Sequence, residues 1–241
     1  MNLPKVLVAS PTYHKKDYCF KTWSDNVKGF TYPNYDVLMV DNSPIDYHKK
    51  LSKHFKTIKV DRGNMNSVQA LTASQNEIRA HFLQYNYDWL FMLESDVIPP
   101  KDIIEYFLIW QHAVHNISYF VQLNKFDNTP TLCLQSHCGL FGLYKNYKSA
   151  MVAPDEGGYW FNGEHYVFNE HGFPLQYGAG SGIGCTFIHR NVMQMVKFRD
   201  ENTQVYSDTY FHFDLMRNNI NDYMDGQMIV KHLTQKIHGR T

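Results

Sequence analysis

The sequence has few cysteines, no long apolar run and no excess of either charge. Its four cysteines, Cys19, Cys133, Cys138 and Cys185, show no CxxC spacing, which argues against the common zinc and redox motifs and favours free thiols. No apolar run approaches the ~20 residues that cross a bilayer, and the start of the sequence lacks the charged-then-apolar pattern of a secretion signal. These absences predict a soluble, cytoplasmic protein without a transmembrane segment.

Charge is balanced over the 241 residues, with 23 Lys and Arg against 23 Asp and Glu. A neutral total gives no reason to expect a polyanionic partner, although a local basic face would still allow a nucleic-acid substrate. With 44% hydrophobic residues the chain can bury a substantial core, and its length favours one domain over two small ones. We therefore expect a single domain over residues 1–241.

The first half alternates patterns typical of strands and of helices. Short apolar, β-branched runs predict buried strands, and amphipathic or well-capped segments predict helices. The predicted strands are Lys5–Ser10, Tyr35–Val40, Thr57–Val60 and Asp88–Leu93, and the predicted helices are Lys15–Phe30, Asn66–Tyr85 and Pro99–Val114. This alternation predicts an α/β fold with a mostly parallel sheet flanked by helices.

The second half is less regular. Strands are expected at Tyr119–Leu123 and Leu140–Tyr144, and short helices at Asn191–Phe198 and Ser207–Asn218. Between Pro154 and Gly184 lies a stretch rich in glycine and aromatic residues that is too irregular for a run of helices. We expect residues 1–117, approximately, to form a nucleotide-binding half and residues 118–241 to form the other, acceptor-side wall of a cleft.

Polar clusters follow each of the first four predicted strands. In open parallel sheets, ligands bind beyond the carboxyl ends of the strands. The clusters are Pro11-Thr12-Tyr13, Asp41-Asn42-Ser43, Asp61-Arg62-Gly63-Asn64 and Glu94-Ser95-Asp96. Four such ends in succession predict one polar ligand that lies across the edge of the sheet.

Glu94-Ser95-Asp96 is the most informative of these clusters. Its two carboxylates are separated by one residue directly after a hydrophobic strand. Such a pair can present hard oxygen ligands to Mg²⁺ or Mn²⁺, which in turn bridges phosphate oxygens. A polar turn that caps the following helix through Ser95 or Asp96 is an equally good interpretation of these residues alone.

The ordered set of motifs resembles the GT-A glycosyltransferases, particularly the inverting family 2 group and its viral and bacterial relatives. The resemblance extends from Lys5 to about Leu233, nearly the whole chain. Each fragment is loose, but their order and spacing are more specific. The fragments are VASPTYHK, VLMVDNSP, DWLFMLESDVIPP, GAGSGIGCTFIHRNV, YSDTYFHFDLMRNN and IVKHL.

The resemblance implies a GT-A fold and a nucleotide-sugar donor, most commonly a UDP-sugar. In such enzymes the turn after the first strand and the aspartate after the second hold the base and ribose, and a residue near the third approaches the base or phosphates. The donor-binding residues implied here are Pro11, Thr12, Tyr13, Asp41, Arg62, Glu94, Ser95 and Asp96. The acceptor is a glycan or another hydroxyl-bearing molecule, with a modified nucleic-acid base among the candidates.

The resemblance also implies a divalent metal held by Asp96 and by His232, which matches the late histidine of the family. An imidazole ligand favours Mn²⁺ over Mg²⁺. The family often has Asp where this chain has Glu94, so Glu94 is expected nearer the ribose and its direct bond to the metal stays open. Without the family context, a strand-end or surface histidine is the better interpretation of His232, because the chain has 13 histidines.

Asp208 matches the aspartate that inverting members use as general base, beside the acceptor hydroxyl. In the family this motif is often Glu-Asp, whereas this chain has Ser207-Asp208. The same pair is also good helix-capping chemistry. Asp214 is the rival candidate for the base. The resemblance therefore implies transfer with inversion, with Asp208 as the first choice.

Two further segments have less specific interpretations. Residues 178–184 are rich in glycine but lack the GK[ST] ending of a P-loop, so they either let the backbone approach the donor or acceptor closely or form a tight turn. The upstream aromatic residues are candidates for an acceptor platform. They are Tyr159, Trp160, Phe161 and Tyr166.

Two alternatives from other classes are retained. A sugar-phosphate nucleotidyltransferase would use a similar sheet, but it usually has a glycine-rich turn after the first strand, whereas this turn reads PTYHKK. A non-catalytic carbohydrate-binding protein would account for the aromatic residues, but it leaves the acidic residues and His232 unexplained.

Overall fold

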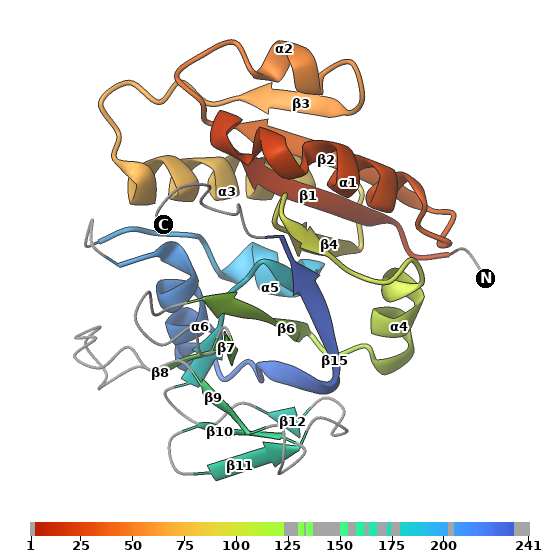
Figure 1. The fold of residues 1–241 in the computed structure, drawn as a ribbon, viewed down its shortest axis with the longest axis vertical. Coiled ribbons are helices and arrows are strands. Elements are labelled where there is room, and N and C mark those ends of the chain that lie inside the picture. Colours follow the sequence, from red (N-terminus) through yellow and green to blue (C-terminus); the bar gives the residue numbers. More distant parts are fainter. Residues whose placement is uncertain are drawn as a thin grey trace, which may run out of the picture.

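The computed structural model describes residues 3–122, 130–132, 134–136, 150–153, 158–161, 164–167, 173–174, 179–201 and 205–233. Figure 1 shows a layered α/β arrangement in which one twisted sheet runs through the molecule. The helices are η1 (His14–Lys16), α1 (Asp17–Lys28), α2 (His48–Leu51), α3 (Ser67–Gln84), α4 (Ile103–Trp110), α5 (Arg190–Met195) and α6 (Ser207–Arg217).

The described strands form one large sheet and a separate two-stranded sheet of β8 and β13. They are β1 (Val6–Thr12), β2 (Tyr35–Asp41), β3 (Lys56–Lys59), β4 (Trp89–Leu93), β5 (Val97–Ile98), β6 (Val114–Gln122), β7 (Pro130–Leu132), β8 (Leu134–Ser136), β9 (Ala150–Ala153), β10 (Gly158–Phe161), β11 (Glu164–Val167), β12 (Phe173–Pro174), β13 (Ala179–Ser181), β14 (Cys185–His189) and β15 (Tyr223–His232).

The central sheet has the strand order β3-β2-β1-β4-β14-β6, with β15 alongside β6. Strand β1 pairs in parallel with β2 and β4, and β2 with β3. Strand β14 is antiparallel to both β4 and β6, whereas β15 is parallel to β6. The sheet is therefore mostly parallel with one reversed strand, which confirms the predicted α/β class.

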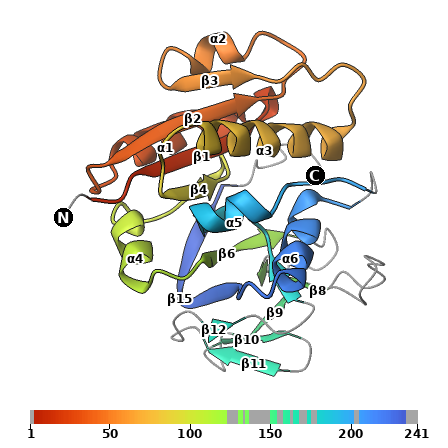
Figure 2. The ribbon, with the colours of Figure 1, turned by 180° about the vertical axis from the view of Figure 1, so that it is seen from behind.

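Two cores cover the two faces of this sheet because successive side chains of a strand point to opposite sides. Val6 and Val8 of β1 pack with residues of α1 and α4. Leu7 and Ala9 pack with residues of α3, α5 and α6. Figure 1 shows α1 in front of the sheet, and Figure 2, seen from behind, shows α3 in front instead.

Helix α3 begins where its capping chemistry predicts. The side chain of Asn66 accepts a hydrogen bond from the Gln69 backbone N–H at 2.9 Å, and the Gln69 side chain accepts one from the Asn66 N–H at 3.0 Å. This reciprocal pair is a capping box, which satisfies two otherwise unpaired N–H groups. On the inner face, Val68, Ile78 and Phe82 are buried.

Helix α4 is shorter than the sequence predicts. Gln111 adopts the left-handed conformation (φ 52°), which is a common way for a helix to end. The helix therefore stops at Trp110, and Val114 begins strand β6 rather than ending α4. The strand expected at Tyr119–Leu123 is the second part of β6, which starts five residues earlier.

Other expectations for the second half have mixed outcomes. The two short helices predicted there correspond to α5 and α6, while β14 and most of β15 were not predicted as strands. The Pro154–Gly184 stretch contributes only short strands to the described residues. The expected strand at Leu140–Tyr144 lies outside the described residues, as do Cys133 and Cys138; Cys19 and Cys185 are buried and free. Within the described segments, no helix has both the length and the apolar character needed to cross a membrane.

Candidate active site

A cavity of about 500 Å³ opens at the carboxyl ends of β1, β2 and β4. Ligands of open α/β sheets bind at this kind of edge. Its walls come from the turns after these strands, from the start of α3 and from the segment before α6. The lining residues are Pro11, Thr12, Tyr13, Lys15, Lys16, Asn42, Arg62, Ser67, Leu71, Glu94, Ser95, Asp96 and Tyr206.

Most of the donor-binding residues expected from the sequence line this cavity. They are Pro11, Thr12, Tyr13, Arg62, Glu94, Ser95 and Asp96. The hydroxyl of Thr12 donates to that of Ser95 at 3.1 Å, which ties the end of β1 to the turn after β4. The guanidinium of Arg62 lies 5.3 Å from the centroid of the Tyr13 ring, close enough for a cation–π contact.

The structure does not bring Asp41 to the cavity. Its carboxylate is fully buried, accepts hydrogen bonds from the N–H and the hydroxyl of Ser43, and pairs with Lys59 at 3.3 Å. The next residue, Asn42, lines the cavity instead. Its amide donates to the Ser74 hydroxyl at 3.0 Å and the Ala70 carbonyl at 3.3 Å, which holds the side chain against α3.

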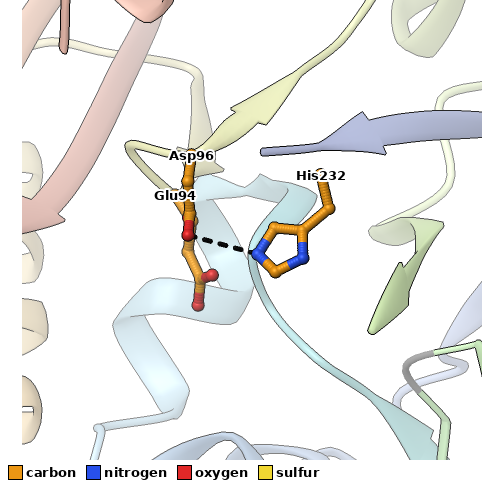
Figure 3. A group of neighbouring side chains, drawn as sticks. All are labelled: Glu94, Asp96 and His232. Carbon is orange, nitrogen blue, oxygen red and sulfur yellow. Dashed lines mark hydrogen bonds and ion pairs between the residues drawn. The ribbon is translucent and has the colours of Figure 1, made fainter. Parts of the chain in front are cut away.

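Glu94, Asp96 and His232 form a cluster whose ligand atoms all lie within 4.8 Å of one another. Figure 3 shows the two carboxylates side by side on the segment after β4, with the imidazole facing them from the end of β15. The pairing of His232 with Val97 in β5 brings these distant segments together. The Leu233 N–H also donates to the Asp96 carbonyl at 2.7 Å.

The donor set of this cluster fits a divalent cation. Two carboxylates and one imidazole are the mixture of ligands that Mn²⁺ accepts. His232 Nε2 donates to Asp96 Oδ2 at 3.2 Å, whereas Asp96 Oδ1 and His232 Nδ1 are buried without a hydrogen-bond partner among the described residues. Buried polar atoms are rarely left unpaired in folded proteins, so an unsatisfied carboxylate oxygen here indicates a place for a ligand.

Gly184, at the turn before β14, leaves room for the carboxylate of Glu94. A Cβ atom at this position would overlap the hydroxyl of Tyr119 and lie 2.9 Å from the carboxyl carbon of Glu94. The Gly184 carbonyl also accepts a hydrogen bond from the Glu94 N–H at 2.8 Å. The need for glycine at this position is therefore one of space, and it couples the glycine-rich segment to the acidic cluster.

The pKa values of the two carboxylates in the cluster are shifted in opposite directions. Burial, with the negative charges of Asp96 and Asp208 added to it, raises the pKa of Glu94 to about 7. Burial also works against ionisation of Asp96, but the hydrogen bond from His232 and the ammonium of Lys16 outweigh it, so the pKa of Asp96 lies below its usual value. Burial lowers the pKa of His232, and its contact with Asp96 more than reverses this, so the net shift is upward. Such opposed shifts are frequent in functional sites.

Positive side chains face these carboxylates from the segment after β1. The ammonium of Lys16 contacts Asp96 Oδ2 directly. Lys15 and Arg62 also line the cavity, which therefore combines positive groups suited to a diphosphate with carboxylates suited to a metal.

Asp208 lies in the first turn of α6, two residues after the cavity-lining Tyr206. It is half-buried, and its carboxylate accepts a hydrogen bond from the Thr209 N–H at 2.8 Å. Its charge contributes to the raised pKa of Glu94, after burial and Asp96. Asp208 itself is not among the residues that line the cavity. The hydroxyl of Ser207 bonds Gln75, which anchors this end of α6 to α3.

Asp214, the rival for the catalytic base, has a different environment. Its carboxylate forms a two-pronged ion pair with Arg199, with N–O distances of 2.8 and 2.9 Å. It lines a second cavity, of about 470 Å³, rather than the one that contains Glu94 and Asp96. Bidentate pairing with arginine is a stabilising arrangement, so the contacts of Asp214 are structural.

A network of buried polar side chains contacts the glycine-rich segment, residues 178–184, at Ser181. His212, one turn after Asp208 on α6, forms an ion pair with Asp222 and hydrogen-bonds the backbone of Ser181. Asp222 accepts a hydrogen bond from Asn116, which in turn accepts one from Thr186 at 2.9 Å. This network of hydrogen bonds fixes α6 relative to β6, β13 and β14. It therefore also fixes the position of Asp208 relative to Gly184.

No family model and no curated protein matches this sequence, whereas solved structures do. TarS from S. aureus aligns with 95% of this chain and 37% of its own, at 13% identity and a TM-score of 0.58. TarS 1–349 in complex with UDP-GlcNAc aligns with 96% of this chain and 59% of its own, at 11% identity and a TM-score of 0.56. The mannosyltransferase PcManGT from Pyrobaculum calidifontis, in complex with GDP-Man and Mn²⁺, covers 98% and 59%, at 13% identity and a TM-score of 0.55.

The chain has a GT-A fold. It spans 37 to 60% of the length of the TarS chains that it matches. A synthetase also matches: CMP:2-keto-3-deoxy-manno-octonic acid synthetase complexed with CTP aligns with 94% of this chain and 90% of its own, at 10% identity and a TM-score of 0.50. At these identities the likeness is one of fold.

Within the GT-A fold, sequence reasoning missed several residues of the cavity. Lys16 lies three residues after Tyr13, in a lysine pair that the sequence shows. Asn42 belongs to a polar cluster noted in the sequence, but the donor-binding role was assigned to Asp41. Tyr206 had no such signal. The side chains of the aromatic residues considered as an acceptor platform, on β10 and β11, lie outside the described part of the structure.

Proposed function

We propose that this protein is a metal-dependent glycosyltransferase that moves a sugar from a nucleoside-diphosphate sugar to an acceptor hydroxyl, with inversion of the anomeric centre. The observation that carries the proposal is the meeting of Glu94, Asp96 and His232 at a 500 Å³ cavity on the ligand-binding edge of a GT-A sheet. The complexes of the similar structures with UDP-GlcNAc and with GDP-Man and Mn²⁺ support it.

The cavity can accommodate the parts of a nucleotide-sugar in a definite order. Tyr13 and Leu71 offer flat or apolar surfaces for the base, and Asn42 offers an amide in place of the buried Asp41. The hydroxyls of Thr12 and Ser95, 3.1 Å apart on the cavity wall, would face the diphosphate. A UDP-sugar is the first donor to test.

Asp96 and His232 are the proposed ligands of the cation, with Glu94 either a third ligand or a partner of the ribose. When bound, the cation would offset the negative charge that accumulates on the diphosphate as it departs. The chain itself contributes Lys15, Lys16 and Arg62, whose positive charges favour the diphosphate over uncharged ligands.

Asp208 is the proposed general base. Its carboxylate lies two residues after the cavity-lining Tyr206, at the start of a helix that Ser207 and His212 anchor, and would receive the proton of an attacking hydroxyl. Asp214 is less suited because Arg199 already neutralises it. Residues 118–241 would then supply the acceptor side of a single domain, and a glycan or another hydroxyl-bearing molecule would be the acceptor.

The test is a thermal-shift panel of UDP, GDP, dTDP and CDP, each with and without Mn²⁺. A ligand at 100 times its Kd stabilises a protein by about 2.7 kcal/mol, which is readily measured. We expect one diphosphate to stabilise the protein in a Mn²⁺-dependent manner. Stabilisation by no diphosphate under either condition would overturn the proposal.

A nucleotidyltransferase is the alternative function, and the similarity to the synthetase is the reason to test it. Such an enzyme would release pyrophosphate from a nucleoside triphosphate and a sugar or sugar phosphate. The turn after β1, Pro11-Thr12-Tyr13, has no glycine to let a triphosphate approach the backbone. Pyrophosphate release with CTP or UTP, and none of the diphosphate expected from a nucleotide-sugar, would favour this alternative.

A further inference from the structure

Asp96 already has a cation beside it. The ammonium of Lys16 contacts Oδ2 of this carboxylate, and the same oxygen accepts hydrogen bonds from His232 at 3.2 Å and from Tyr18 at 3.5 Å. The carboxylate side chain is 2% exposed, whereas that of Lys16 is 40% exposed. The lysine therefore reaches in from the cavity wall to neutralise a buried anion.

A divalent cation on Asp96 cannot leave this contact unchanged. If the metal binds through Oδ2, it competes with the ammonium for one oxygen. If it binds through Oδ1, which has no hydrogen-bond partner among the described residues, two positive centres share one small carboxylate and repel each other strongly because the site is partly removed from water.

Lys16 can move without a change of backbone. Its N–H donates to the Tyr13 carbonyl at 2.8 Å at the end of η1, and α1 begins at the next residue. Among the described residues, the hydrogen bond and the ion pair of its side chain both go to Asp96. Because Lys16 lines the cavity together with Lys15 and Arg62, a diphosphate in the cavity offers a new partner for the displaced ammonium.

We propose that Lys16 is a resident counter-cation, which competes with the divalent metal for Asp96 and transfers to the donor diphosphate when the metal binds. This inference rests on the proposed function, since it assumes a metal and a nucleoside diphosphate in the same cavity. It makes metal and nucleotide binding mutually dependent: metal alone must displace the lysine, whereas metal with nucleotide gives the lysine a replacement anion. Such coupling is reciprocal and is commonly worth about 5- to 150-fold in affinity.

The test is the variant Lys16→Met, which keeps the length of the side chain and removes its charge. Binding of Mn²⁺ alone is measured from the electron paramagnetic resonance signal of free Mn²⁺, and binding of UDP at saturating Mn²⁺ is measured by calorimetry. We expect Mn²⁺ alone to bind about tenfold more tightly than in the parent and UDP to bind about tenfold less tightly. The two changes have opposite signs, which loss of folding cannot produce.

Two matched variants isolate the contact. Lys15→Met removes a charge from the same wall, but Lys15 is exposed and forms no ion pair with the described residues, so Mn²⁺ affinity should stay within about twofold of the parent because exposed charges interact weakly. Lys16→Arg keeps the charge and should retain the weak binding of Mn²⁺ alone. Circular dichroism checks that each variant is folded.

The outcomes separate this inference from the proposed function. If the parent binds Mn²⁺ but Lys16→Met binds it equally or less tightly, Lys16 does not compete with the metal and the inference is overturned. Equal tightening in Lys15→Met would also overturn it, because the effect would then be one of general charge. If the parent binds no Mn²⁺ with or without UDP, and so behaves like Asp96→Ala, the proposed metal-dependent function is wrong, whatever Lys16→Met does.

Discussion

The ends of β2 and β4 differ although both carry a buried aspartate. Asp41 and Asp96 are 0% and 1% exposed, and a lysine contacts each. The oxygens of Asp41 are occupied by Ser43 and Lys59, and the residue stays outside the cavity. Asp96 has one oxygen without a hydrogen-bond partner in the described part of the structure, lines the cavity and lies beside Glu94 and His232.

The comparison indicates that a strand-end carboxylate can serve as a ligand site only where its neighbours leave one of its oxygens without a hydrogen bond. Asp41 ends a strand, and the following residue, Asn42, is directed into the cavity instead. Asp96 lies three residues beyond the end of β4, on a turn that β15 and Gly184 close from the other side. The predictions that follow test this contrast.

The strongest test exchanges the two aspartates for neutral residues. Asp96→Ala should abolish Mn²⁺-dependent UDP binding and lower turnover by about 10³-fold or more, because metal assistance is worth several kcal/mol. Asp41→Asn should leave Mn²⁺ affinity unchanged and lower the free energy of unfolding by about 1–3 kcal/mol, since Lys59 and Ser43 lose their charged partner. Calorimetric binding and urea unfolding measure the two effects; equal loss of Mn²⁺ binding in both variants would remove the distinction.

The second test applies the same contrast to α6. Asp208→Asn keeps the shape of the side chain and should reduce turnover by about 10²-fold or more while Mn²⁺ and UDP bind normally. Asp214→Asn should instead retain turnover and cost about 1–3 kcal/mol of stability by disrupting the pair with Arg199. Single-turnover kinetics supply the measurement. Retention of configuration in the product, seen by NMR, would contradict the role of Asp208.

A third test asks whether Gly184 keeps the end of β4 open. Gly184→Ala should push Tyr119 and Glu94 apart, cost about 1–3 kcal/mol as overpacking does, and weaken Mn²⁺ binding. Gly29→Ala is the control, because its Cβ would meet mainly the flexible end of Lys101, at 3.1 Å. Thermal unfolding and Mn²⁺ titration are measured together. If both variants behave alike, the close approach of Gly184 to Glu94 does not matter.

The smallest expected effect is a pH dependence of metal binding. The pKa of Glu94 is raised to about 7, so the folded protein holds a proton here that the unfolded chain would release. The contribution of Glu94 to the stability of the metal-free protein is therefore present at low pH and is lost as the pH rises through about 7. A metal requires deprotonated ligands. Mn²⁺ affinity should therefore rise severalfold between about pH 6 and pH 8.

Glu94→Gln tests the source of that dependence. The variant should bind Mn²⁺ more weakly at about pH 8 and show a flatter profile. A residual slope of the same sign belongs to His232, whose pKa is also raised, after burial is offset by Asp96. An unchanged profile in this variant would assign the whole dependence to His232.

Local patterns in the sequence were sufficient to predict much of the first half. The runs that became β1, β2, β3 and β4 alternate with helical segments, and the cap at Asn66 marks the start of α3. Because parallel strands place their carboxyl ends at one edge, the sequence alone indicated where Thr12, Arg62 and Asp96 would lie. Helix α4 was less predictable, since its end depends on the left-handed conformation of Gln111.

Only the tertiary structure decided how the distant segments complete the site. The pairing of β15 with β5 brings His232 to Asp96 across 136 positions, and the reversed strand β14 brings Gly184 against Glu94. Asp96 has partners far away in the sequence, Lys16 and His232. Asp41 has partners nearer in the sequence, and the pairing of β2 with β3 places Lys59 beside it. The physical reason is that hydrogen-bond satisfaction and steric space belong to the assembled neighbours of a residue, whereas strand and helix patterns belong to its immediate sequence.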